Sequence, residues 1–323
     1  MIRVGVIGLG FMGGVHLRNW QARSDAEVVA VCDAILPVAG DSKQGNLDVG
    51  GESLDLEGIA TYTDAAEMFA AESLDAVSIA LPTHLHRPIA IQALEAGTHV
   101  LCEKPMALNV EDCDAMIVAA KKAERLLMIA HCIRFWPEYV WLKQVIDSGE
   151  YGKLRAAEFQ RLSAAPGWDS NSWFADVSKS GGIALDLHIH DLDFIQYCFG
   201  EPVQARAACS RFDNDVPGHV QTWLDYGNNA AISATGSWMM PKSFGFKMSY
   251  SAVFETAAAF FEGRGVKVFP AEGEPFTVEV DGDGYAAEIE HFAKLVGGQE
   301  RTMVVTPEDA RESVRMALEV TEQ

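Results

Sequence analysis

The chain has few basic side chains for its length. Its 323 residues include 25 Lys and Arg against 46 Asp and Glu, which gives a formal net charge of −21. A protein of that charge repels a phosphate backbone and an anionic lipid surface. We therefore expect neither nucleic acid nor a membrane among its partners.

Long hydrophobic runs and paired cysteines are also missing. No uninterrupted apolar segment reaches the roughly 20 residues of a membrane-spanning helix, and the first residues lack the pattern of a signal peptide. The six cysteines are scattered and no CxxC occurs. This usage is typical of reduced thiols, so we expect a cytoplasmic protein.

The sequence contains no internal repeat and no low-complexity tract, and its length favours two domains over one. Strand and helix patterns alternate up to about residue 130, which predicts a doubly wound parallel sheet in residues 1–130. Strands separated by short turns dominate after that point, which predicts mainly antiparallel pairing in an α+β domain over residues 131–323. We expect helices near 64–71, 88–96, 110–125, 139–148, 182–199, 285–296 and 307–322. We expect strands near 75–81, 98–102, 126–130, 154–162, 221–226, 230–237, 246–254 and 266–269.

The clearest motif is a strand that runs from Ile2 into a glycine-rich turn. Gly8 permits a tight turn, Gly10 leaves room for a pyrophosphate, and Gly13 lets the following helix approach the strand. Asp33 ends the next apolar run about 20 residues later, where a carboxylate can accept hydrogen bonds from ribose hydroxyls. The spacing indicates a dinucleotide-binding Rossmann domain, although glycines also mark ordinary turns.

Two further groups of residues can carry chemistry. Lys104 follows the strand at 98–102, and ligands of open α/β sheets bind beyond such strand ends; the alternative is a solvated lysine beside a loop. Asp186, His190 and Asp193 share one face of a predicted helix, and a histidine beside a carboxylate can remove a proton from a hydroxyl. The alternative is a structural His–Asp pair.

A metal site is not expected. His188 and His190 point to different sides of a helix and cannot chelate one ion together. His84 and His86 lie in a loop, but no third ligand is evident. Tryptophans at 136, 168 and 173 can serve as platforms for sugar rings, but such residues are more often part of a core or interface.

Taken together, these motifs resemble the Gfo/Idh/MocA oxidoreductases, whose namesakes are glucose-fructose oxidoreductase and inositol dehydrogenase. The resemblance spans nearly the whole chain. It depends on the glycine-rich start, Pro82-Thr83-His84-Leu85-His86, the run from Ala93 through Glu103-Lys104-Pro105, Arg134-Phe135-Trp136-Pro137, Gly181-Gly182 with Asp186 and His190, and Tyr285.

The resemblance implies a fold and a set of functional residues. It implies an N-terminal Rossmann domain and a C-terminal α+β domain on an open, mixed, mainly antiparallel sheet, through which we expect a homodimer or homotetramer. Lys104, Asp186 and His190 match the family's catalytic positions. The expected cofactor-binding residues are Gly8, Gly10, Phe11, Met12, Gly13, Asp33, Pro82, Thr83, His86, Glu103 and Lys104. The expected substrate-binding residues are Arg134, Trp173, Asp186 and His190.

The predicted function is that of an NAD-dependent dehydrogenase. We expect hydride transfer between nicotinamide and a secondary alcohol of a sugar, sugar derivative or cyclitol. NAD is expected in preference to NADP, because Asp33 repels a 2′-phosphate. Two alternatives remain at this point: an NAD-binding sensor without turnover, and a glycoside hydrolase assisted by tightly held NAD.

Overall fold

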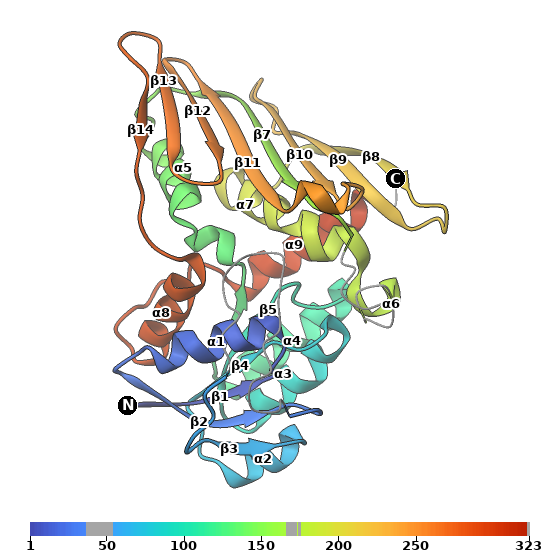
Figure 1. Cartoon of the computed structure of the whole chain (residues 1–323), viewed down its shortest axis with the longest axis vertical. Coiled ribbons are helices and arrows are strands. Elements are labelled where there is room, and N and C mark those ends of the chain that lie inside the picture. The colour runs from blue at the N-terminus through green and yellow to red at the C-terminus, as the bar shows by residue number, and fades with distance from the viewer. Residues whose placement is uncertain (37–53, 166–172, 174–175, 322–323) are drawn as a thin grey trace. The chain divides into compact units, whose positions relative to one another are not determined.

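The computed structural model of the chain describes residues 1–36, 54–165, 173 and 176–321. These residues form two compact units (Figure 1). Unit 1 comprises Met1–Cys132 and Tyr285–Arg311, and unit 2 comprises Ile133–Gly284 and Glu312–Gln323. The chain leaves unit 1 near the predicted boundary at residue 130. It re-enters unit 1 at Tyr285, whereas the predicted second domain was one continuous segment, residues 131–323.

A six-stranded parallel sheet forms the centre of unit 1, as the alternating pattern predicted. Its strands are β1 (Ile2–Ile7), β2 (Ala26–Cys32), β3 (Ala60–Tyr62), β4 (Ala76–Ile79), β5 (His99–Glu103) and β6 (Leu127–Ala130). The spatial order is β3-β2-β1-β4-β5-β6, so the direction of winding reverses between β1 and β4. Ligands of doubly wound folds bind beyond the strand ends at such a reversal.

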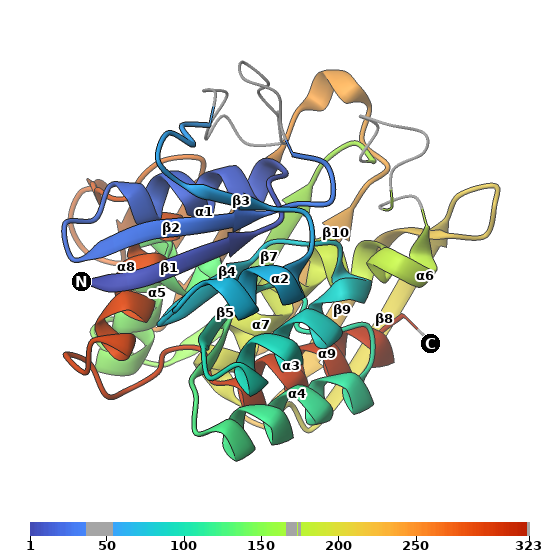
Figure 2. The ribbon, with the colours of Figure 1, turned by 90° about the horizontal axis from the view of Figure 1, so that it is seen from below.

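Helices lie on both faces of this sheet. They are α1 (Phe11–Gln21), α2 (Ala65–Ala71), α3 (His86–Glu95), α4 (Val110–Ala123) and α8 (Gly284–Val296). Helix α3 contacts both α2 and α4, and Figure 2 shows these three helices together. Side-chain caps begin two of them: Asp64 accepts backbone N–H groups of α2, and Asn109 accepts one of α4.

The return of the chain to unit 1 has a clear packing cause. The rings of Trp20 on α1 and Phe292 on α8 are both fully buried and meet edge to face, 6.4 Å apart. Trp20 also donates its indole N–H to Ser78 Oγ on β4 at 2.8 Å. Because an aromatic pair buries a large apolar area, α8 completes the core of the nucleotide-binding unit. An amphipathic pattern shows that a helix needs a partner but does not say which one.

Unit 2 contains an eight-stranded sheet. Its strands are β7 (Leu154–Leu162), β8 (Gln204–Arg211), β9 (Pro217–Asp225), β10 (Ala231–Ser237), β11 (Lys247–Phe254), β12 (Ala257–Glu262), β13 (Val266–Pro270) and β14 (Phe276–Val278). The order is β14-β13-β12-β11-β7-β10-β9-β8. Every neighbouring pair is antiparallel except β7 with β10, so the expected mixed, mainly antiparallel sheet is confirmed.

One face of this sheet packs against helices α5 (Pro137–Ser148) and α7 (Ile189–Phe199). Tyr139 of α5 lies in an aromatic core, 4.9 Å from the ring of Phe194 and 5.3 Å from that of Tyr250. The strands alternate, so every second residue points away from these helices. Phe260 and Trp223 are among the large side chains that remain exposed, at 43% and 46%.

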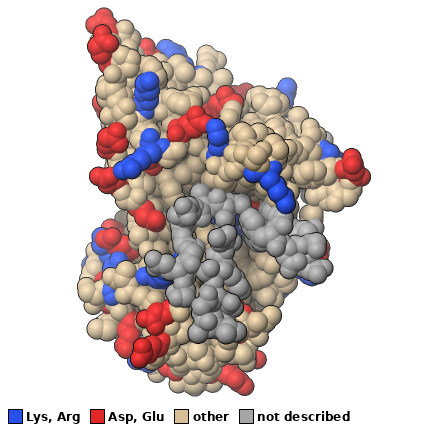
Figure 3. Space-filling model, in the orientation of Figure 1, with Lys and Arg blue, Asp and Glu red and all other residues tan. Residues whose placement is uncertain are grey.

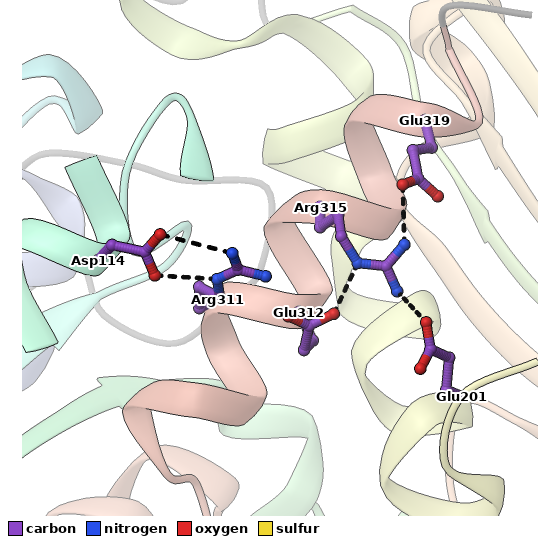
Figure 4. Close-up of polar contacts among 6 residues, drawn as sticks. All are labelled: Asp114, Glu201, Arg311, Glu312, Arg315 and Glu319. Atoms are coloured by element: carbon purple, nitrogen blue, oxygen red, sulfur yellow. Dashed lines mark hydrogen bonds and ion pairs between the residues drawn. The ribbon is translucent and has the colours of Figure 1, made fainter. Parts of the chain in front are cut away.

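Polar contacts lie at the start of helix α9 (Pro307–Glu319) and along its length. Thr306 and Asp309 cap its start reciprocally, each side chain accepting the backbone N–H of the other. Within unit 1, Arg311 binds Asp114; within unit 2, Arg315 binds Glu312, Glu319 and Glu201 (Figure 4). Such partly exposed ion pairs contribute little stability individually and mainly orient the helix.

Short elements join the larger ones: η1 (Thr83–Leu85), η2 (Cys132–Phe135), α6 (Val177–Ser180), η4 (Ala184–His188) and η5 (Lys242–Phe244). The predicted helix over 182–199 is divided, because η4 is a π-helical turn that precedes α7. The loop predicted after Asp33 falls largely outside the described residues. In the described part of the chain, no helix combines the length and apolarity needed to cross a membrane.

Candidate active site

The glycine-rich turn after β1 requires glycine at two positions for different reasons. Gly8 has a φ of +88°, and a Cβ there would lie 2.3 Å from the carbonyl oxygen of Ala80. A Cβ on Gly13 would lie 1.7 Å from the carbonyl oxygen of Gly8. Neither position can hold a side chain unless the backbone moves. These contacts bring α1 directly against the end of β1.

Gly10 differs from its neighbours because it faces open space. A Cβ built there would meet no atom of the described residues within 4 Å. Gly10 is also the N-cap of α1 and has no side chain that could bond the first N–H groups of the helix; Phe11 and Met12 follow, both half-buried. A helix N-terminus with free N–H groups and room beside it suits a negatively charged pyrophosphate. The turn therefore fits the diphosphate of a dinucleotide.

Asp33 lies at the end of β2 and is held against this turn. Its Oδ2 accepts the backbone N–H of Leu9 at 2.6 Å, and its Oδ1 accepts that of Ile35 at 2.9 Å. A carboxylate has about four acceptor sites, so these two bonds leave capacity for the hydroxyls of a ribose. The glycine-rich turn, which is predicted to bind the pyrophosphate, and Asp33, which is predicted to bind the ribose, thus lie side by side.

A second loop follows β4 and carries Pro82, Thr83 and His86. Pro82 is half-buried and precedes η1, while Thr83 is buried within it. The two ring nitrogens of His86 each lie 2.8 Å from a backbone carbonyl oxygen, one of Leu81 and one of Pro105. Burial lowers the pKa of His86, although the two carbonyl groups oppose this shift. The His86 side chain thus joins the β4 and β5 loops, and its expected contact with a cofactor stays a prediction.

Lys104 follows the last residue of β5, at the carboxyl edge of the sheet, and is half-buried. Its backbone N–H donates to Oε2 of Glu103 at 3.1 Å. The Glu103 side chain is buried, and its Oε1 lies 3.1 Å from Nε2 of His16. Burial by itself would raise the pKa of Glu103, but the hydrogen bond and charge of His16, with the charges of Lys104 and His86, lower it overall. His16 did not emerge from the motif spacing, because its partner is far away in the sequence.

In unit 2, the accessible side of the η4–α7 segment carries two of the predicted residues. Asp186 lies in η4 and His190 in the first turn of α7, and both are half-buried. Leu185 and the three residues 187–189 are buried. Asp186 and His190 therefore share the accessible side. A π turn is rare and occurs often at functional sites.

Neighbouring acidic residues of α7 have a different role. Arg134 and Asp193 form a buried bidentate ion pair with N–O distances of 2.9 and 2.8 Å. Ser313 donates to the same carboxylate at 2.8 Å. These contacts place Asp193 in the interior instead of on the face of His190. The guanidinium of Arg134 is also held inside unit 2 by this pair, and its expected contact with substrate stays a prediction.

His188 is likewise an interior residue. It is fully buried, with Nε2 2.8 Å from the hydroxyl of Thr222, and burial lowers its pKa to about 3. Among the described residues, no group of three or more His, Cys, Asp or Glu is arranged to hold a metal ion. Trp173 is half-buried, and Trp168 lies outside the described residues.

The parallel sheet, its order and the glycine-rich turn of unit 1 define a nucleotide-binding Rossmann domain. Residues 2–131 match the description "Oxidoreductase family, NAD-binding Rossmann fold", and residues 139–257 match "GFO/IDH/MocA C-terminal domain". The chain belongs to the GFO/IDH/MocA family.

Relatives within this family are similar over different lengths. The scyllo-inositol 2-dehydrogenase (NAD(+)) of Bacillus subtilis is 28% identical over 99% of this chain and 93% of its own length. The myo-inositol 2-dehydrogenase of Thermotoga maritima is 34% identical, but the match covers 63% of this chain and only 56% of that protein. The aldose-aldose oxidoreductase of Caulobacter crescentus has the same fold, with a TM-score of 0.84, 21% identity, and coverage of 99% of this chain and 96% of that one.

Proposed function

We propose that the chain is an NAD-dependent dehydrogenase that oxidises or forms a secondary alcohol of a sugar, sugar derivative or cyclitol. The observation that carries this proposal is the hydrogen bond between Asp33 and Leu9 in the glycine-rich turn, in a chain of this family. This bond holds the Asp33 carboxylate, our proposed ligand of the ribose, beside a turn that suits a pyrophosphate. The polyol substrate class is supported by the names of the inositol dehydrogenases to which the chain is similar.

The proposed roles follow from the chemistry of each side chain. Bound NAD supplies the nicotinamide ring that accepts or donates the hydride. His190 removes the hydroxyl proton, because imidazole is a competent base near neutral pH. Asp186 orients His190 or binds a neighbouring hydroxyl. The ammonium group of Lys104 stabilises negative charge that develops on oxygen.

The remaining cofactor and substrate contacts are part of the same proposal. Gly10, Phe11 and Met12 bind the pyrophosphate, and Asp33 binds the adenosine ribose. Pro82 and Thr83 follow β4, and Glu103 is the last residue of β5, at the strand ends where we expect the nicotinamide half. Trp173 is proposed as a platform for the substrate ring, since an indole packs well against the apolar face of a sugar.

We propose further that the protein works as a homodimer or homotetramer in the cytoplasm. Exposed apolar residues on the strands of unit 2, including Phe260 and Trp223, support association through this sheet. Figure 3 shows both signs of charge on the face drawn, with uncharged surface between them. The negative net charge gives no support for a nucleic acid as partner.

A substrate screen tests the proposed function. The protein is mixed with NAD or NADP and with a panel of sugars and cyclitols that includes myo-inositol and scyllo-inositol, and NADH is followed by its absorbance. We expect turnover with at least one polyol and a preference for NAD. Tight binding of NAD without turnover on any member of the panel would favour a sensor. Release of an aglycone from glycosides without net NADH would favour the hydrolase.

A further inference from the structure

Unit 1 contains a buried polar pair that leads directly to Lys104. His16 comes from α1 and Glu103 from the end of β5, and their side chains are only 1% and 9% exposed. One oxygen of Glu103 lies 3.1 Å from Nε2 of His16, and the other accepts the backbone N–H of Lys104 at 3.1 Å. A single carboxylate therefore connects helix α1 with the backbone of Lys104.

The hydrogen-bond partners define which ring nitrogen of His16 donates. Nδ1 of His16 is buried and has no hydrogen-bond partner among the described residues. A neutral ring protonated on Nε2 donates to Glu103 and leaves only a lone pair at Nδ1, whereas a charged ring would bury an N–H without an acceptor. In this arrangement Oε1 of Glu103 accepts the N–H of His16, and Oε2 accepts the backbone N–H of Lys104.

Burying this polar pair costs free energy, and close packing of the interior does not require polar side chains at these positions. A buried carboxylate loses its hydration, and apolar residues of similar volume often pack equally well or better in its place. The pair instead fixes the orientation of the Glu103 carboxylate, because its two oxygens accept hydrogen bonds from two different parts of the chain. The donors are the ring of His16 and the backbone of Lys104.

We propose that His16 is a positioning residue for Lys104, acting through the carboxylate of Glu103. The consequence for turnover rests on the function proposed above, but the effect on Lys104 itself does not. His16 donates to Oε1 of Glu103, and Oε2 of the same carboxylate accepts the backbone N–H of Lys104. The backbone from which the lysine side chain extends is therefore held in place. A small displacement of a catalytic group can cost roughly 10²-fold in rate.

Three substitutions of His16 separate positioning from packing. His16→Gln retains an N–H donor at about the reach of Nε2, His16→Asn holds its donor closer to the backbone, and His16→Leu removes it. The matched control is Ser78→Ala, which removes the acceptor of the buried hydrogen bond made by Trp20, also on α1. Stability is measured for each variant by urea unfolding.

Two readouts are compared. The first is the rate at which acetic anhydride modifies Lys104, followed by peptide mass spectrometry without turnover. The second is kcat and the KM for NAD, with myo-inositol or whichever polyol of the panel is oxidised. For His16→Asn and His16→Leu we expect a change of about threefold or more in Lys104 labelling, kcat lowered about tenfold or more, and little change in KM. His16→Gln should keep Lys104 labelling and kcat close to their wild-type values, and Ser78→Ala should alter only the stability.

The outcomes are distinguishable. If the Asn and Leu variants match Ser78→Ala in labelling and in kcat, the positioning role is overturned. If His16→Leu does not fold, the comparison of Gln with Asn decides, because both are polar and differ in reach. If the wild type oxidises no polyol, the proposed function fails, and the labelling of Lys104 alone decides the role of His16.

Discussion

Asp33 connects the two parts of the proposed adenosine site. Its two oxygens accept backbone N–H groups from Leu9 and Ile35, so the carboxylate that we propose as the ribose ligand is also bonded to the glycine-rich turn. A negative charge at this position disfavours the 2′-phosphate of NADP. Cofactor choice is therefore expected to depend on this residue.

Substitution of Asp33 by alanine should weaken use of NAD and narrow its advantage over NADP. Loss of a hydrogen bond to a charged group costs about 1.5–3 kcal/mol, which corresponds to roughly 10- to 150-fold in kcat/KM for NAD. The kcat/KM values for the two cofactors provide the measurement. Asp64→Ala is the control, because Asp64 caps α2 and should affect stability alone. Equal or better use of NADP by the wild type would contradict the assignment.

Lys104→Ala and His190→Ala should both fold, bind NAD nearly normally and lose turnover. Removal of a general base typically costs roughly 10²–10⁴-fold in rate, and removal of a donor that stabilises developing charge roughly 10²–10³-fold, so we expect a loss of about 10²-fold or more for each. His190→Ala should also lose the acid limb of the pH–rate profile. Stopped assays of kcat together with NAD titration followed by tryptophan fluorescence separate these effects.

His188→Ala is the control for this pair of variants. The ring of His188 is buried and bonded to Thr222, so its loss should reduce stability more than turnover. Near wild-type turnover in Lys104→Ala or in His190→Ala would remove that residue from the mechanism. Loss of NAD binding in the lysine variant would instead give Lys104 a role in holding the cofactor.

At the scale of elements, the contact of η4 with the sheet of unit 2 should be sensitive to acid. His188 projects from η4 to Thr222 on β9, and a Cβ on Gly236 of β10 would lie 3.0 Å from its Nδ1. Burial lowers the pKa of this histidine to about 3, whereas the pKa of a histidine in the unfolded chain is about 6.5. The folded chain therefore requires the neutral ring.

The sign of the pH effect follows from that difference. Between these pKa values the unfolded chain binds a proton that the folded chain does not, so stability falls as pH decreases from about 6.5 towards 3, by up to about 1.4 kcal/mol per pH unit. His188→Gln should flatten this slope, as measured by urea unfolding at pH 7, 6 and 5. The exposed His84→Gln should leave it unchanged. Equal slopes in wild type and His188→Gln would show that His188 is not the source.

At the scale of the whole molecule, the outward side of the unit 2 sheet is the expected site of self-association. Val253, Phe260 and Trp223 are all more than 40% exposed there, and Phe260 lies opposite Ser251 in the register of β11 and β12. Solvent contact with several large apolar side chains on one surface is unfavourable. A second copy of the chain would cover them.

Light scattering after gel filtration should therefore give a mass of two or four chains of 35.1 kDa at micromolar concentration. Phe260→Glu or Trp223→Glu should shift the mass towards the monomer, because a buried unpaired charge at an interface is costly. Val118→Glu on α4 of unit 1 replaces another exposed apolar residue and should not change the mass. A monomeric wild type would overturn this prediction.

Local patterns in the sequence were sufficient for most of the architecture. The parallel and the mainly antiparallel sheets followed from the spacing of strands, helices and turns, and the glycine-rich turn with Asp33 followed from the spacing of its glycines and of the acid after them. Strands β3, β8, β12 and β14 were not predicted individually. Partly polar or short segments carry a weak signal until their neighbours in the sheet are known.

Contacts between distant residues were decided only in the folded chain. The packing of Phe292 on Trp20, the pairing of Arg134 with Asp193, and the bond between His16 and Glu103 each join segments far apart in sequence. Periodicity shows that a side chain will be buried, but the identity of its partner depends on how the elements pack. For this reason the sequence pointed to Lys104 and His190 as candidates, whereas the interior contacts that support their elements became visible only in three dimensions.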